Sequence, residues 1–247
     1  MKRLFSVLSV VIAMGMLLAA CAPAASNKVR VVTDATWPPF EMLDESTKEI
    51  QGLDMDIMKA IAADQGFEVE FINVPFDSAL AGLSQCQYDA GISAITITED
   101  RKKTMAFSDP YFEAGQIITV NVANTEINSV EDLKGKKVGA QIGTTGAIEA
   151  GKIEGVDFVG YDTIDPAFLA VMSNQIDAVI ADNPLALGYV SKNSDKLKTV
   201  GNIFTEENYG IAVCPKNTEL LAKINKGLAN VKASGKIDEL SKTWMSK

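Results

Sequence analysis

The sequence predicts an α/β fold made of two similar units, each with a mostly parallel sheet covered by helices. Short β-branched runs alternate along the chain with segments whose apolar residues recur at helical spacing, the order that gives a parallel sheet. This alternation occurs once in each half of the chain. With 247 residues, the chain is long enough to give both units a core.

The first unit begins with a β-branched strand at Val29–Thr33 that ends in the turn residues Asp34–Pro39. The elements that follow alternate between helix and strand. They are a helix through Leu53, Ile57, Met58 and Ile61 that ends at Gly66, a strand at Glu68–Ile72, a helix through Ala79, Leu80 and Leu83, and a strand at Ala90–Ala94.

The second unit repeats this order. Ser129–Asp132 has the pattern of a capping box, closed by Gly135. The predicted elements after it are strand Lys137–Gln141 running into Gly143–Gly146 and a helix, strand Val156–Val159, a helix from Asp165-Pro166, strand Asp177–Ala181, strand Tyr209–Val213, and two amphipathic helices with apolar residues over 220–231 and 237–244.

Polar residues follow the ends of four predicted strands. These residues are Asp34, Ala94 to Thr96, Gln141 to Thr145, and Asp182. In open α/β sheets, ligands bind outside the carboxyl ends of the strands. The sequence therefore predicts a small-molecule site in these segments.

The composition is that of a folded, acidic protein. With 47% hydrophobic and 22% charged residues, the chain is not disordered. Its 32 acidic and 23 basic residues give a net charge of −9, which repels phosphate backbones, so we expect no nucleic-acid partner. The absence of histidine excludes Ser-His-Asp triads, Cys-His dyads and histidine metal sites, and three widely spaced cysteines cannot form a zinc cage. We expect no metal and no cofactor.

The first 20 residues have the form of a secretory signal peptide. Lys2 and Arg3 precede an uncharged run from Leu4 to Ala20. The alternative is a transmembrane anchor, but the strongly apolar part, Leu4 to Leu18, is shorter than the roughly 20 residues that cross a bilayer. The run ends in Leu18-Ala19-Ala20-Cys21, which resembles the lipobox of bacterial lipoproteins. That resemblance implies lipidation of Cys21 and attachment to a membrane surface, with residues 21–27 as a tether.

Three stretches make the chain similar to a known family. They are Asp34 to Glu41 (DATWPPFE), Gly52 to Asp56 (GLDMD), and Asp89 through Phe112, which contains SAITITEDR and FSDPY. Together they resemble the amino-acid-binding proteins of ABC transporters, family 3 of the bacterial extracellular solute-binding proteins, over residues 28–245. The resemblance implies the two-lobed type II periplasmic binding protein fold, with a ligand cleft between lobes joined by a two-strand hinge. Lobe 1 would comprise residues 28–111 and 210–247, and lobe 2 residues 112–209.

The same resemblance implies a clamp for the backbone of a free amino acid. Arg101 would hold the carboxylate with its planar guanidinium, helped by the Thr96 hydroxyl, backbone N–H groups near Ala94 and Thr145, and the helix start that contains Thr144. Asp182 would hold the ammonium. From the sequence alone, Arg101 could instead be a surface residue of a charge run, and Asp182 could be a helix N-cap.

The resemblance also implies a pocket for the ligand side chain. Trp37 and Phe76 align with positions where the family places aromatic rings against the ligand, although either could be plain core. Asp34 would meet the far end of the ligand, with Ser93 and Gln141 nearby. An acid and two aromatic rings suit a cation, so we expect arginine or lysine. Glutamine or another neutral polar amino acid is the alternative.

The two remaining cysteines, Cys86 and Cys214, are expected to form a disulfide in an oxidising compartment, with two free thiols as the alternative.

The function predicted from the sequence is that of a monomeric, lipid-anchored extracytoplasmic binding protein that delivers a polar amino acid to an ABC transporter permease by hinge closure. It would not be an enzyme. Two other functions stay open. A dehydratase like cyclohexadienyl dehydratase would need a pocket carboxyl of raised pKa, for which Glu41 and Asp34 are candidates. A sensor domain would need a separate membrane partner.

Overall fold

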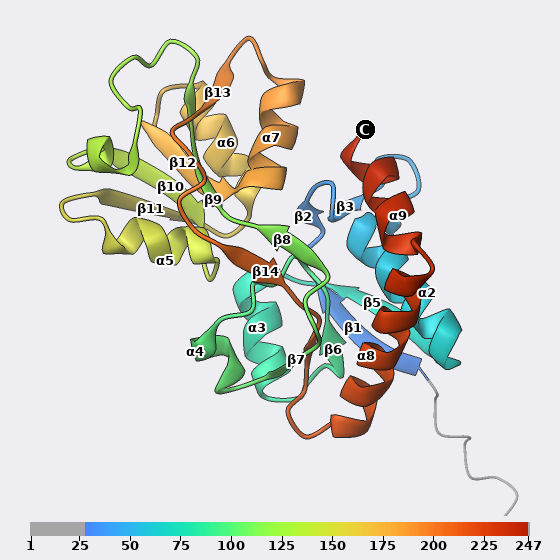
Figure 1. Ribbon diagram of the computed structural model, residues 1–247. Helices are drawn as coiled ribbons and strands as arrows, with labels where there is room; N and C mark the ends of the chain where they lie inside the picture. Colours follow the sequence, from blue (N-terminus) through green and yellow to red (C-terminus); the bar gives the residue numbers. More distant parts are fainter. Residues whose placement is uncertain (1–27, 247) are drawn as a thin grey trace, which may run out of the picture.

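The computed structural model describes residues 28–246, which form two α/β lobes (Figure 1). The expected signal peptide (1–20), the lipidation site Cys21 and the tether (21–27) lie outside the described residues. Within residues 28–246, no helix is both long enough and apolar enough to cross a membrane.

The first lobe is built on a five-stranded sheet in the order β5-β1-β6-β15-β7. β1 pairs in parallel with β5 and β6, while β15 runs antiparallel to β6 and β7. The strands are β1 (Lys28–Thr33), β5 (Glu68–Asn73), β6 (Ala90–Gly91), β7 (Ala106–Phe107) and β15 (Ala212–Val213). Val31 packs with α2 and α8, whereas Val32 packs with α3, because successive side chains of a strand point to opposite faces.

Helices cover both faces of this sheet. Figure 1 shows α3 on one side and α2, α8 and α9 on the other. The helices are α2 (Leu53–Gln65), α3 (Phe76–Ser84), α8 (Thr218–Ala233) and α9 (Lys236–Met245), with the short α4 (Glu99–Lys102) near the lobe edge. A small sheet of β2 (Thr36–Trp37), β3 (Glu41–Leu43) and β4 (Ile50–Gln51) precedes α2.

The second lobe has a five-stranded sheet in the order β11-β10-β12-β9-β13. The strands are β9 (Gln116–Asn121), β10 (Lys137–Gln141), β11 (Asp157–Tyr161), β12 (Ala178–Asp182) and β13 (Leu197–Val200). Helix α5 (Thr145–Lys152) covers one face, and α6 (Ile164–Met172) and α7 (Asn183–Lys192) cover the other. The expected capping box is present, with Ser129 and Asp132 bonding reciprocally at the start of the 3₁₀ turn η2 (Val130–Leu133).

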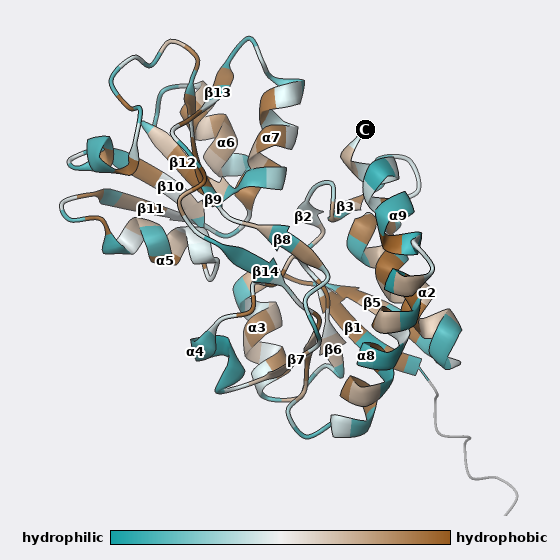
Figure 2. Ribbon diagram, in the orientation of Figure 1, coloured by the Kyte–Doolittle hydropathy of each residue, from teal (hydrophilic) through white to brown (hydrophobic). Residues whose placement is uncertain are grey.

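Two antiparallel strands join the lobes. β8 (Phe112–Ala114) leads from the first lobe to the second, and β14 (Glu207–Tyr209) returns. Figure 1 shows the pair between the two sheets, and Figure 2 shows that β14 is largely hydrophilic although it lies in the middle of the molecule. Glu207 and Tyr209 are both buried, so this strand brings polar groups into the space between the lobes.

Several element boundaries differ from the sequence prediction. The single strand predicted at Tyr209–Val213 is two strands, β14 and β15, because the chain passes from the hinge into the first sheet at Gly210 and Ile211. The strand predicted at Ala90–Ala94 is only β6, and Ala94 has a positive φ of 45°. Strands β9 and β13 were not predicted. Helix α6 starts one residue before the predicted Asp165, with Thr163 at its N-cap.

The structure pairs Cys86 with Cys214, whose Cα atoms are 5.0 Å apart. Cys86 follows α3 and Cys214 follows β15, so the bridge ties together two parts of the first lobe that are 128 residues apart in sequence.

Candidate functional site: a polar cavity between the lobes

A cavity between the lobes is lined by residues from both of them. They are Asp34, Trp37, Glu41, Phe76, Ser93, Ala94, Thr96, Arg101, Thr144, Thr145 and Asp182. The sequence-predicted site residues are therefore brought together, with Gln141 reaching the cavity wall through a hydrogen bond to Asp34. The lining side chains approach one another so closely that the free space is about that of one water molecule. The lobes are thus closed.

Asp34, directly after β1, holds one end of the cavity. Its Oδ2 accepts hydrogen bonds from the Phe76 N–H at 3.1 Å and from the side-chain amide of Gln141 at 2.6 Å. Its Oδ1 accepts from the Thr36 hydroxyl at 2.9 Å, and its N–H donates to Ser93 Oγ at 3.0 Å. Burial raises the pKa of Asp34, against the opposing effect of these hydrogen bonds. Because Gln141 belongs to the second lobe, its bond to Asp34 also connects the lobes.

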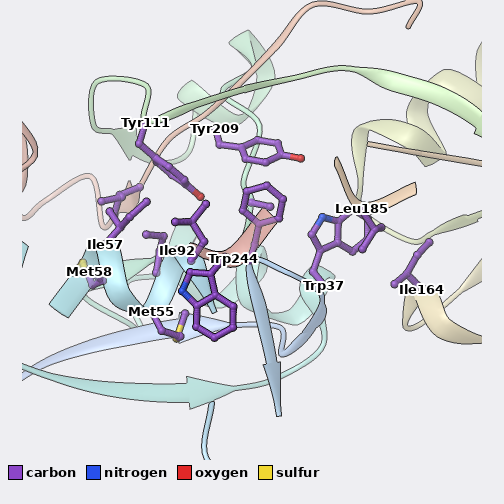
Figure 3. Close-up of a cluster of buried hydrophobic side chains, with 14 of the residues drawn as sticks. Trp37, Met55, Ile57, Met58, Ile92, Tyr111, Ile164, Leu185, Tyr209 and Trp244 are labelled. Atoms are coloured by element: carbon purple, nitrogen blue, oxygen red, sulfur yellow. The ribbon is translucent and has the colours of Figure 1, made fainter. Parts of the chain in front are cut away.

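The two aromatic residues of the predicted pocket have different surroundings. The Phe76 ring lies under Arg101, whose guanidinium carbon is 5.4 Å from the ring centroid, within the range of a cation–π contact. Trp37 packs across the lobe boundary with Ile164 and Leu185, as Figure 3 shows. Its indole N–H is buried without a hydrogen-bond partner among the described residues, so the ring supplies a donor to the cavity wall.

Arg101 is buried although its neighbours in the charge run are exposed. Thr98 caps α4 by accepting a hydrogen bond from the Arg101 backbone N–H at 3.1 Å. The Arg101 side chain points inward: its Nη1 donates to the Thr96 carbonyl and its Nη2 donates to the Gly143 carbonyl, each at 2.8 Å. The surface alternative considered for Arg101 is therefore wrong, and the guanidinium faces the second lobe with its fork of donors.

Asp182 lies at the end of β12, at the N-cap position of α7. Its side chain makes no capping hydrogen bond. It accepts instead from the Gln116 amide at 2.7 Å and from the Tyr209 hydroxyl. Burial raises the pKa of Asp182 to about 7, and the nearby charge of Glu207 adds to the rise. Burial lowers the pKa of Arg101 to about 10, while the negative charges of Asp182 and Glu207 raise it.

The start of α5 forms the second-lobe wall of the cavity. Thr144 caps this helix by accepting from the Ala147 N–H at 3.2 Å, and Gly143 before it has a positive φ of 82°. The Thr145 hydroxyl donates to Glu207 at 2.8 Å. Thr96 on the first lobe donates to the same Glu207 oxygen at 2.7 Å. The Thr96 hydroxyl, expected to serve a ligand carboxylate, thus has its hydrogen directed to Glu207.

A buried carboxyl pair supports the first-lobe wall. The Glu41 side chain accepts from the Ser93 hydroxyl at 2.9 Å, and Asp54 accepts from the Ala94 N–H at 2.8 Å and the Tyr111 hydroxyl at 2.7 Å. Burial and the neighbouring charge of Asp54 raise the pKa of Glu41 well above its ordinary value. The Ala94 N–H, expected to serve a ligand carboxylate, is already bonded to Asp54.

Gln116, Glu207 and Tyr209 are site residues that the sequence analysis missed. Gln116 begins β9 and the other two lie on β14. None of them belongs to a recognised motif. The pairing of the two hinge strands brings them next to Asp182. Glu41, which also lines the cavity, was noted as a candidate acid and lies within a recognised motif.

The chain is similar to known proteins over most of its length. The model of the bacterial extracellular solute-binding proteins, family 3, matches residues 29–247. A protein of Neisseria gonorrhoeae described as a probable histidine-binding protein is 35% identical over 236 residues, which cover 92% of this chain and 87% of that protein. ABC transporter arginine-binding protein 1 of Escherichia coli strain K12 is 34% identical and covers 90% of this chain and 92% of its own.

Solved structures are similar to this chain over most of its length as well. An ancestral arginine-binding protein bound to arginine is 45% identical, with a TM-score of 0.85, and the match covers 88% of this chain and 98% of that one. The ancestral arginine-binding protein bound to glutamine is 44% identical, also with a TM-score of 0.85, over 91% of this chain and 100% of that one.

Proposed function

Because this chain belongs to the bacterial extracellular solute-binding proteins of family 3, we propose that it captures a basic L-amino acid, arginine or lysine, for an ABC importer. Its family and relatives are extracytoplasmic solute-binding proteins rather than enzymes, which removes the basis for the dehydratase alternative. The ligand would enter an open cleft, and closure of the lobes would trap it and present the closed form to a membrane permease.

The charge of the cleft carries this proposal. Among the described residues, the buried charged side chains are Asp34, Glu41, Asp54, Asp182, Glu207 and Arg101, five carboxyl groups and one guanidinium. Buried charges are stable only when they are paired. An arginine or lysine ligand brings one carboxylate and two cationic groups. Burial raises the pKa of four of these carboxyl groups, those of Asp34, Glu41, Asp54 and Asp182. A ligand of net positive charge favours their ionised forms, which a neutral amino acid does not.

The two ends of the cavity suggest how such a ligand lies. Arg101 offers a planar fork of donors suited to the carboxylate, and Asp182 offers an acceptor for the ammonium. Asp34 is the other acceptor of the cavity, which Phe76 and Trp37 also line, and there the cationic tip would be held by charge and by an aromatic face. The Gly143 carbonyl that now accepts from Arg101 and the Gln141 amide that now donates to Asp34 would both give way to the ligand.

Glutamine is the second candidate, and one contact favours it. Asp34 already accepts a hydrogen bond from a side-chain amide, that of Gln141, at 2.6 Å. A glutamine ligand could replace that amide with its own. The binding of glutamine by the ancestral relative is consistent with this reading.

Attachment to the membrane is part of the proposal. Cys21 would carry the lipid, and the tether 21–27 would leave the two lobes free to open. Labelling of expressed protein with a radioactive fatty acid should succeed in the native chain and fail in Cys21→Ala. Equal labelling of both would show that Cys21 is not the anchor.

Titration calorimetry tests the binding function. The chain from residue 22 would be unfolded and refolded to remove any carried-over ligand, and then titrated with each of the twenty amino acids. We expect tight one-to-one binding of arginine or lysine. Tight binding of glutamine would keep the transport function and overturn the charge argument. No detectable binding of any of the twenty amino acids would overturn the amino-acid-binding function itself.

A further inference from the structure

Gln116, the first residue of β9, and Glu207, on β14, lie close to Asp182. The Gln116 Nε2 is 2.7 Å from Asp182 Oδ1, 3.0 Å from Glu207 Oε1 and 3.1 Å from Thr145 Oγ1. Because one nitrogen reaches both carboxylates, these two oxygens lie within about 6 Å of each other. Gln116, Glu207 and Asp182 are all buried.

Uncharged groups supply the hydrogen bonds to the two carboxylates of this cluster. An amide nitrogen carries two hydrogens, so Gln116 cannot satisfy three acceptors at once. The hydroxyl hydrogens of Thr96 and Thr145 are both directed to Glu207 Oε2. Glu207 Oε1 also accepts from the Thr205 hydroxyl at 3.0 Å, and Asp182 also accepts from the Tyr209 hydroxyl. Among the described residues, the donors to these two carboxylates are thus all uncharged, and an ammonium with three hydrogens would supply the positive charge that they lack.

We propose that Glu207 is a second counter-ion for the α-ammonium of the ligand, acting together with Asp182 and held in place by Gln116. This inference rests on the proposed amino-acid-binding function and adds a residue to its site. An α-ammonium carries three donors in a compact group, enough for one bond to each carboxylate and a third to an uncharged oxygen. The Thr96 hydroxyl can accept that third bond, because its hydrogen is used on Glu207, whereas Thr145 already accepts from Gln116.

The position of Arg101 fits the same orientation. The carboxylate and ammonium of an α-amino acid are attached to one carbon, so their binding groups must be neighbours. The Arg101 guanidinium interacts electrostatically with both Asp182 and Glu207, yet its hydrogen bonds go to the carbonyl groups of Thr96 and Gly143. The site thus has adjacent donor and acceptor ends, and Glu207 belongs to the acceptor end.

Glu207 also connects the ammonium to the hinge. It lies on β14, and Gln116 follows β8 after a single residue, Gly115. Glu207 accepts from Thr96 of the first lobe and from Thr145 of the second. A ligand that binds Glu207 therefore contacts β14, the return strand of the hinge, as well as both lobes. A ligand without an ammonium provides no positive charge for the Glu207 carboxylate.

The test compares L-arginine with its des-amino analogue, 5-guanidinopentanoate, in the refolded protein and in Glu207→Gln. We expect the variant to bind arginine at least about tenfold more weakly, the effect of losing a charge-assisted hydrogen bond. Binding of the des-amino analogue should fall by less than about threefold or improve, because that ligand has no cation to offer Glu207. Glu206→Gln, the same change at the exposed neighbouring residue, is the control and should leave both affinities unchanged.

Equal losses for the two ligands would show that Glu207 only holds the lobes together, and affinities like those of Glu206→Gln would show that it has no role. Either result overturns the inference while the wild-type binding stands. If Glu207→Gln does not fold, Glu207→Asp enters the same comparison with the same criterion. If wild-type protein prefers glutamine, glutamine and glutaramate replace the arginine pair. Wild-type protein that binds no amino acid would overturn the proposed function as well.

Discussion

Asp34 is the residue on which ligand selectivity depends most directly. Its carboxyl group is buried, faces the second lobe and has an amide as its strongest partner. Asp34→Asn keeps the shape and removes the charge. We expect it to weaken arginine or lysine binding by about tenfold to a hundredfold, the loss of a charge-assisted hydrogen bond, and glutamine binding by less than about threefold.

Calorimetric titration of both ligands measures this difference. Asp77→Asn is the matched control, because Asp77 is exposed at the start of α3 beside the buried Phe76. Equal losses for arginine and glutamine in Asp34→Asn would mean that Asp34 only supports the structure around Ser93 and Phe76.

Asp182 makes binding depend on pH. Burial raises its pKa to about 7 in the ligand-free closed form, above the ordinary value of 3.8. Between these two values the native protein holds a proton that the unfolded chain does not, so this group's contribution to the free energy of unfolding falls as pH rises from about 4 to about 7. A ligand ammonium requires the ionised carboxylate. Binding should therefore release a proton below about pH 7, with the apparent affinity falling up to about tenfold per pH unit.

Titrations in buffers of different ionisation enthalpy count the released protons. The count should approach one at about pH 5.5 and fall toward zero at about pH 8.5. A count near zero across this range would mean that the Asp182 carboxyl is already ionised before the ligand arrives.

At the residue scale, the site residues in motifs and at strand ends could be predicted from the sequence, whereas those in and next to the hinge strands could not. Arg101, Asp34 and Asp182 follow strand ends or recognised motifs, where ligand binding is expected. Gln116 and Glu207 are separated by 91 residues and meet only because β8 and β14 pair. No local pattern encodes that meeting.

At the scale of elements, the hinge tolerates little added volume. A Cβ on Gly115, between β8 and β9, would lie 2.2 Å from the Thr205 carbonyl oxygen. Gly115→Ala must therefore push apart the two strands that join the lobes. We expect a loss of about 1–3 kcal/mol in the free energy of unfolding, as for an overpacked core position, and weaker ligand binding because Gln116 is the next residue.

Denaturant unfolding and calorimetry measure these two effects. Gly188→Ala is the control: Gly188 lies inside α7, and no atom lies within 4 Å of its added Cβ. Alanine should stabilise that helix by up to about 1 kcal/mol. Gly115→Ala with native stability and affinity would show that the hinge can absorb the methyl group and that its close packing has no role in closure.

The element predictions failed where tertiary pairing decides the outcome. Strand β10 (Lys137–Gln141) was predicted with its observed bounds, because Gly135 before it and Gly143 after it are local turn signals. Strand β9 was not predicted, although all but its last residue are buried. Its role depends on pairing with β12 and β13, which come more than fifty residues later.

At the scale of the whole molecule, the closed arrangement is held by contacts that a ligand would share or replace. The lobes meet through Asp34 with Gln141, Arg101 with Gly143, and Trp37 with the apolar residues Ile164 and Leu185. The apolar contact can persist in the liganded state, whereas the polar contacts occupy groups that the ligand needs. Resemblance to a family predicted the two lobes and the cleft, whereas the contacts between cleft side chains that close it are seen only in the structure.

The crystal structure of the refolded protein with its tightest-binding amino acid tests the central claim most directly. We predict a ligand between the lobes, with its carboxylate on Arg101, its ammonium on Asp182, and its side-chain tip at Asp34 in place of the Gln141 amide. A ligand bound outside this cavity, or inside it with the carboxylate and ammonium reversed, would contradict the account.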